Sequence, residues 1–100
     1  MPAGEIRFRR EAEADLAEAF DWYESQTPGL GVEFLKSVES ALDVIVSNPR
    51  LYHEVVQNAR RAIMRRFPFA ITYLPVGRSI IVLAVLHQAR DPECGRGRVS

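Results

Sequence analysis

Two segments with helical periodicity are the clearest feature of the chain. Residues 11–26 carry one apolar stripe and no β-branched residue, and residues 31–47 carry a second, wider stripe. The stripes consist of Leu16, Phe20 and Tyr23, and of Phe34, Val38, Leu42 and Ile45. A Thr-Pro-Gly sequence at residues 27–29 ends the first segment, and Asn-Pro at 48–49 ends the second. Because the connection is only about five residues long, we expect an antiparallel helical hairpin.

Most of the remaining chain alternates in the manner of β-strands. Four strands are expected, at residues 5–10, 61–66, 69–74 and 80–87. The first is short enough to be an edge strand, and the residues before position 59 are expected to form a loop. The last is apolar on both faces, which predicts a central strand that the hairpin covers on one side.

This order of elements indicates an α+β fold. It consists of an N-terminal strand and an antiparallel helical hairpin packed on a small antiparallel sheet. One hundred residues, of which 47% are hydrophobic, make a single domain over residues 1–100. From about residue 93 the chain is expected to be a flexible polar tail.

A cytoplasmic location is the expectation for this protein. Its single cysteine, Cys94, allows no disulfide within the chain. The N-terminus lacks the apolar region of a signal peptide. The longest apolar run, residues 80–86, is too short to cross a bilayer, so no membrane partner is expected.

A formal net charge of zero hides a division of charge along the chain. Residues 1–56 hold 5 basic and 11 acidic side chains, whereas residues 57–100 hold 8 basic and 2 acidic ones. This division predicts an acidic helical face and a basic sheet face. Twelve of the 13 basic residues are arginines, which bind phosphate and carboxylate groups in a bidentate manner. Six of them form the candidate binding set: Arg60, Arg61, Arg65, Arg66, Arg78 and Arg90.

Three interpretations of these arginines are open. They are solvated strand ends, a phosphate-binding surface, or a docking surface for an acidic protein segment. Alternation places Arg61 and Arg65 on one strand face with apolar neighbours. Those neighbours are Ile63, Phe67 and Phe69. Such a mixture is common at protein interfaces and in proteins that bind single-stranded nucleic acid.

Few other residues suggest chemistry. His87 ends the last expected strand and is either a strand-end histidine bonded to the backbone or a general acid or base. His53 has no further metal ligand at a suitable spacing, so neither a metal nor a cofactor is expected. Arg90 and Asp91 are either a local ion pair or part of a site. Trp22 lies off the apolar stripe and either covers the helix junction or is exposed for a partner.

Several motifs resemble the RelE/ParE superfamily of toxins from type II toxin–antitoxin systems. The similarity extends from about residue 6 to residue 92. The most specific motifs are WYE at 22–24, PGLG at 28–31, NP at 48–49, RRFPF at 65–69 and VLHQARDP at 85–92. The resemblance implies the fold described above, a bacterial or archaeal cytoplasmic protein, and a cognate antitoxin with an acidic, amphipathic C-terminal segment. That segment is expected to lie on the six arginines.

The superfamily contains two kinds of activity. RelE-like members cut mRNA on the ribosome, and ParE-like members inhibit DNA gyrase. The tryptophan–tyrosine helix, the PGLG turn and the RRFPF strand are more similar to the ParE-like branch. RelE-like cleavage uses basic side chains with a C-terminal tyrosine or histidine. Here the tail after Arg90 has no Tyr, His or Lys, which leaves His87 with Arg65 or Arg66 as the only catalytic candidates.

We therefore expect a toxin that binds gyrase and is not an enzyme. The alternatives are a metal-independent endoribonuclease that acts on mRNA at the ribosome, and an inactive remnant that retains only antitoxin binding.

Overall fold

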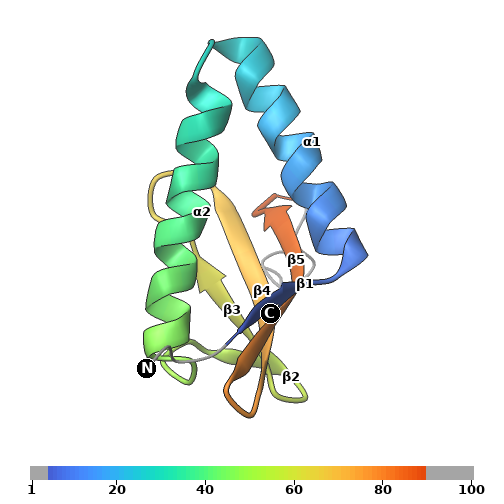
Figure 1. Cartoon of the computed structure of the whole chain (residues 1–100), viewed down its shortest axis with the longest axis vertical. Coiled ribbons are helices and arrows are strands. Elements are labelled where there is room, and N and C mark those ends of the chain that lie inside the picture. Colours follow the sequence, from blue (N-terminus) through green and yellow to red (C-terminus); the bar gives the residue numbers. More distant parts are fainter. Residues whose placement is uncertain (1–4, 90–100) are drawn as a thin grey trace.

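The structure, a computed structural model, describes residues 5–89 of the chain (Figure 1). Its elements follow the order β1 (Ile6–Phe8), α1 (Arg10–Gln26), α2 (Leu30–Ser47), β2 (Glu54–Val56), β3 (Ala59–Ile63), β4 (Phe69–Val76) and β5 (Ser79–His87). The two helices meet at a tight turn and diverge toward the sheet (Figure 1). The α+β class, the hairpin and both helix ranges agree with the prediction. Within residues 5–89 neither helix is long and apolar enough to span a membrane.

The turn between the helices is held by one side chain and two glycines. The Glu24 carboxylate accepts hydrogen bonds from the backbone N–H of Gly29, at 2.8 Å, and of Gly31, at 2.9 Å. Gly29 adopts a left-handed conformation with φ of 89°, which costs glycine little. These contacts explain why the motifs WYE and PGLG occur together, since the glutamate of the first caps the backbone of the second.

Gly31→Ala is expected to destabilise the protein by about 1–3 kcal/mol, because a Cβ atom there has no room. It would lie 2.8 Å from Phe20 Cδ1, 2.8 Å from the Phe20 carbonyl oxygen and 2.9 Å from Glu24 Oε1. Urea unfolding would measure the change, with Ser40→Ala at an exposed α2 position as the control. Alanine is more stable than glycine in a helix where its Cβ atom has room. A gain in stability for Gly31→Ala would therefore show that the two helices do not approach each other this closely.

The sheet contains five strands in the order β1-β5-β4-β3-β2. β1 is an edge strand and β5 lies inside the sheet, both as predicted. However, β1 runs parallel to β5, with Ile6 opposite Ile80, so the sheet is mixed and not purely antiparallel. No short turn links β1 to β5, so nothing in the local sequence determined their relative direction.

The far edge of the sheet differs from the prediction. Residues 54–56 form β2 where a loop was expected, and a turn with positive φ at Gln57 and Asn58 connects it to β3. β3 ends at Ile63, so residues 64–68 form the turn into β4 and do not continue the strand.

The core lies between the hairpin and one face of the sheet. Tyr23 and all four residues of the predicted α2 stripe are buried in it. Leu16 and Phe20 are only half-buried, because they lie toward the outer side of the hairpin near β1. Trp22 is 58% exposed, so of its two predicted roles the structure selects the exposed one.

Candidate functional site

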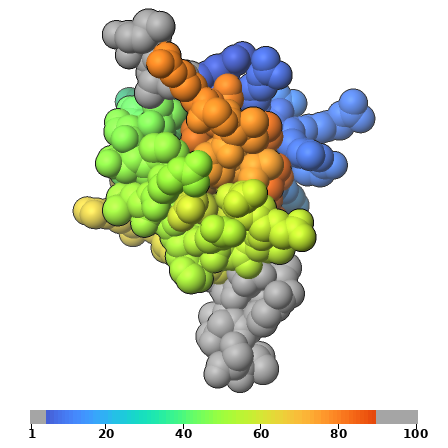
Figure 2. Space-filling view, turned by 90° about the horizontal axis from the view of Figure 1, so that it is seen from below, coloured from blue at the N-terminus to red at the C-terminus, as the bar shows by residue number. Residues whose placement is uncertain are grey.

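The candidate arginines do not form a single patch. Arg65 and Arg66 are exposed in the β3–β4 turn, whereas Arg78 is exposed in the β4–β5 turn. These turns lie at opposite ends of the eight-residue strand β4, roughly 25 Å apart. Figure 2 views the molecule from the end at which the β4–β5 hairpin and the residues after α2 are exposed. The described arginines of the candidate binding set therefore do not lie together at one end of the sheet.

Arg60 binds the chain's own loop. Its Nη1 donates hydrogen bonds to the carbonyl oxygens of Tyr52, at 2.7 Å, and Arg50, at 3.3 Å. Its Nη2 lies 3.7 Å from Glu54 Oε1, and its side chain is only 15% exposed. The role of Arg60 is to fasten the segment after α2 to the sheet.

A tyrosine on β4 assists this fastening. Tyr73 lies opposite Arg60 in the ladder, and its hydroxyl donates a hydrogen bond of 2.7 Å to the carbonyl oxygen of Pro49. Burial raises the pKa of Tyr73, and the nearby Arg60 guanidinium opposes this rise. The phenol therefore stays protonated near neutral pH and keeps its role as a donor.

Arg61 faces the other side of the sheet. It lies opposite Thr72, one position after Arg60, and successive side chains of a strand point to opposite faces. This is the face that the helices do not cover. Ile63, on the same side of β3, is 43% exposed. Arg61 and Ile63 thus combine positive charge and apolar area, as the sequence predicted.

The prediction that Phe67 and Phe69 share this face is wrong. Phe67 and Phe69 are buried in the core under the hairpin, because the turn at residues 64–68 interrupts the alternation. Arg66 lies over the Phe67 ring, 5.4 Å from its centroid, and forms an ion pair with Glu33 of α2. Both partners are largely exposed, so this pair contributes little to stability. Arg90, Asp91 and Cys94 lie outside the described residues.

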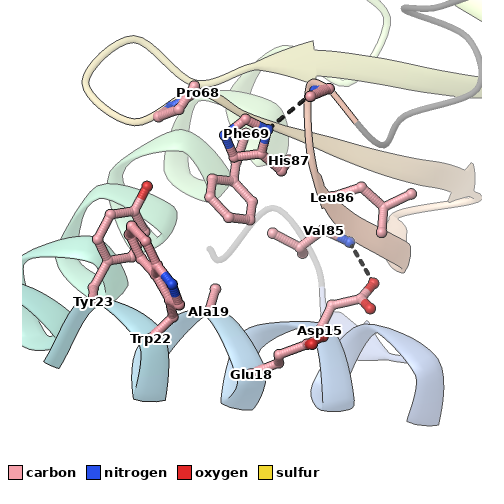
Figure 3. Close-up of a pocket in the computed structure, with 11 residues that line it drawn as sticks. Asp15, Glu18, Ala19, Trp22, Tyr23, Pro68, Phe69, Val85, Leu86 and His87 are labelled. Atoms are coloured by element: carbon pink, nitrogen blue, oxygen red, sulfur yellow. Dashed lines mark hydrogen bonds between the residues drawn. The ribbon is translucent and has the colours of Figure 1, made fainter. Parts of the chain in front are cut away.

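His87 lines a pocket of about 550 Å³ between α1 and the end of the sheet (Figure 3). Its Nδ1 accepts a hydrogen bond of 3.0 Å from the backbone N–H of Ala89. Its ring packs edge-on against Phe69, with centroids 5.3 Å apart. This is the strand-end histidine bonded to the backbone, the first of its two predicted interpretations.

The same pocket is acidic where it meets α1. Asp15 and Glu18 line this wall, and Asp15 Oδ2 accepts a hydrogen bond of 3.0 Å from the backbone N–H of Val85 (Figure 3). Carboxylates repel phosphate groups, so this wall of the pocket disfavours the phosphate of an RNA substrate. The described residues include no group of three acidic, His or Cys side chains that could hold a metal ion.

Sequence reasoning missed this pocket. The signal available was Trp22, the large aromatic residue off the apolar stripe, together with the two carboxylates that precede it by one and two helical turns. The other walls come from β4 and β5, and no sequence pattern indicates which strand ends meet α1.

The chain is similar to known proteins in sequence and in fold. Residues 6–92 match the family model for the "ParE toxin of type II toxin-antitoxin system, parDE". The fold resembles a chain of the chromosomal ParDE system of P. aeruginosa, with a TM-score of 0.73, 20% identity, and coverage of 85% of this chain and 96% of that one. It also resembles a chain of the intact E. coli RelBE toxin–antitoxin complex, with a TM-score of 0.62, 13% identity, and coverage of 82% and 93%. No curated protein sequence matches the chain significantly.

Proposed function

The chain belongs to the ParE toxins of type II toxin–antitoxin systems, and from this premise we propose that it inhibits DNA gyrase by binding until a cognate antitoxin neutralises it. The observation that carries the choice between binding and RNA cleavage is the state of His87. Its Nδ1 accepts a hydrogen bond from the Ala89 N–H, and among residues 5–89 the charged side chains that line its pocket are Asp15 and Glu18. A catalytic acid or base for RNA cleavage would need cations nearby to stabilise the phosphorane.

The antitoxin partner follows from the family and from the relatives, which were solved as the ParDE system and the RelBE complex. In this proposal its acidic, amphipathic segment covers the sheet face opposite the helices. Arg61 supplies positive charge there, and Ile63 and Val76 supply exposed apolar area. An extended segment that orders on binding can cover a long surface of this kind.

The other candidate arginines have different places in the proposal. Arg65 is exposed in the β3–β4 turn, beside the end of β3, and would extend the antitoxin contact. Arg78 is exposed in the β4–β5 turn, two residues after Val76, and would extend the antitoxin contact at the other end of the sheet. Arg90 lies outside the described residues and is assigned to the target. Arg60 is removed from the binding set because its guanidinium is engaged with the loop after α2.

His87→Gln is expected to leave growth inhibition and gyrase inhibition within about twofold of the unaltered protein. Glutamine can accept the Ala89 hydrogen bond but cannot titrate, so a binding mechanism survives the change. The measurement is DNA supercoiling by purified gyrase, in parallel with primer extension on mRNA from programmed ribosomes. Cleavage of mRNA by the unaltered protein that His87→Gln abolishes would contradict gyrase binding and support the endoribonuclease.

A further inference from the structure

The only tryptophan of the chain, Trp22, lies at the rim of the His87 pocket. Its indole packs edge-on against the buried Tyr23, with ring centroids 5.1 Å apart, so its position on α1 is fixed although most of its surface is exposed (Figure 3). Tryptophan is enriched at binding surfaces because a large apolar ring and a polar N–H lie in one side chain. The rim of this pocket is therefore a candidate contact surface.

Two carboxylates give the same wall of the pocket a negative charge. Glu18 and Asp15 precede Trp22 by about one and two turns of α1, so the three side chains lie along one side of the helix (Figure 3). The helix as a whole carries six carboxylates and one arginine. An aromatic ring beside carboxylates suits a guanidinium group, which stacks on the ring and pairs with the acid.

The chain itself supplies guanidinium groups close to this wall. Ala89, the last described residue, lines the pocket. Residues 94–100 contain Arg96 and Arg98 and no acidic side chain. Arg96 follows Ala89 by seven residues, a length that extends to at most about 24 Å. A segment attached this closely has an effective concentration on the order of millimolar at the pocket, so weak contacts are enough to hold it.

The spacing of the two arginines matches the spacing on α1. In an extended segment, Arg96 and Arg98 point to the same side and are about 6.6 Å apart. Glu18 and Trp22 are four residues apart on the helix, which places them about 6 Å apart along its axis. A glycine precedes each arginine, and its lack of a side chain lets the backbone come close to the helix.

We propose that residues 95–98 fold back onto the α1 wall of this pocket, where one arginine stacks on Trp22 and the other pairs with Glu18. Asp15 and Glu18 balance the charge of the two arginines, so the contact leaves no unpaired cation beside His87. In the free chain the contact covers Trp22, and a partner that binds this indole must displace it. It lies within one chain and requires neither gyrase nor an antitoxin, so it stands independently of the proposed function.

Acrylamide quenching of Trp22 fluorescence in the full chain tests this proposal, because no other tryptophan contributes to the signal. The double variant Arg96→Gln/Arg98→Gln is expected to raise the quenching constant about twofold, as loss of a cation–π contact over one face of the indole would. Lysine at both positions should keep part of the protection, because the positive charge remains. In about 1 M salt, where the Debye length is about 3 Å, quenching of the unaltered chain should approach that of the glutamine variant.

Two further variants locate the contact. Glu18→Gln should also raise the quenching constant, and adding it to the double arginine variant should change little, since both remove the same contact. Arg50→Gln, which removes an exposed arginine in the segment after α2, should leave quenching unchanged. The proposal is overturned if the double arginine variant quenches like the unaltered chain, if Arg50→Gln has an equal effect, or if protection of Trp22 increases with protein concentration, which would show that the segment of a second copy is the occupant.

Discussion

Phe34→Ala is expected to lower the free energy of unfolding by about 3–5 kcal/mol. Phe34 is fully buried, and the ring centroids of Tyr23, Phe67 and Phe69 lie 5.3, 5.4 and 5.0 Å from its own. Truncation would remove these contacts and leave a cavity between the hairpin and the start of β4. Since domains of this kind are stable by only about 5–15 kcal/mol, much of the total would be lost.

Urea or thermal unfolding would measure this change, with Val44→Ala as the control. Val44 lies on α2 like Phe34 but is 41% exposed, so its truncation should cost far less. A similar cost for the two variants would mean that the aromatic cluster is not the centre of the core. Because Tyr23 and Phe69 also line the His87 pocket, Phe34→Ala should in addition broaden the NMR signals of the residues that form it.

Arg60→Ala is expected to destabilise the fold by about 1.5–3 kcal/mol, the usual range for hydrogen bonds to a charged group. The guanidinium joins the carbonyls of Arg50 and Tyr52 to the sheet, and its removal would leave those acceptors without their donor. Arg65→Ala is the matched control, since Arg65 is exposed in a turn and its loss should change stability by less than about 0.5 kcal/mol.

The same pair of variants distinguishes a structural Arg60 from one that binds the antitoxin. If Arg60 served binding, its loss would leave the unfolding free energy unchanged and lower the affinity for the antitoxin. We expect the reverse for Arg60→Ala. Its free energy of unfolding should fall, whereas its affinity for the antitoxin, measured at a low temperature where the variant is still folded, should stay close to that of the unaltered chain. Equal stability of Arg60→Ala and Arg65→Ala would refute the structural role.

Elements that depend on local sequence could be predicted well. The helices follow from apolar residues at helical spacing, and their junction follows from a Pro-Gly turn. Burial of the α2 stripe follows from the same periodicity, because one face of an amphipathic helix must lie on a core. The exposed position of Trp22 was also among the alternatives, since it lies off the stripe.

The candidate site could be predicted only in part. The sequence indicates many arginines near the strands, but the strand predicted over residues 61–66 includes three residues, 64–66, that belong to the turn after β3. A strand that ends early changes the face of every following residue, and Phe67 and Phe69 were therefore placed on the wrong side. His87 was identified as a strand-end residue, whereas its acidic neighbours on α1 were not.

By itself, the sequence determined the helical hairpin, the α+β class, the interior position of β5 and the family, because each depends on residues close together in the chain or on motifs within it. The tertiary structure alone decided that β1 runs parallel to β5, that Arg61 and not Arg60 lies on the sheet face away from the helices, and that Asp15 on α1 reaches Val85 on β5. These features join segments up to 74 positions apart, the separation of the paired residues Ile6 and Ile80. Their geometry depends on how the helices and the sheet pack to bury apolar area. That burial depends on the whole chain, so the spacing of residues within one helix or strand does not reveal it.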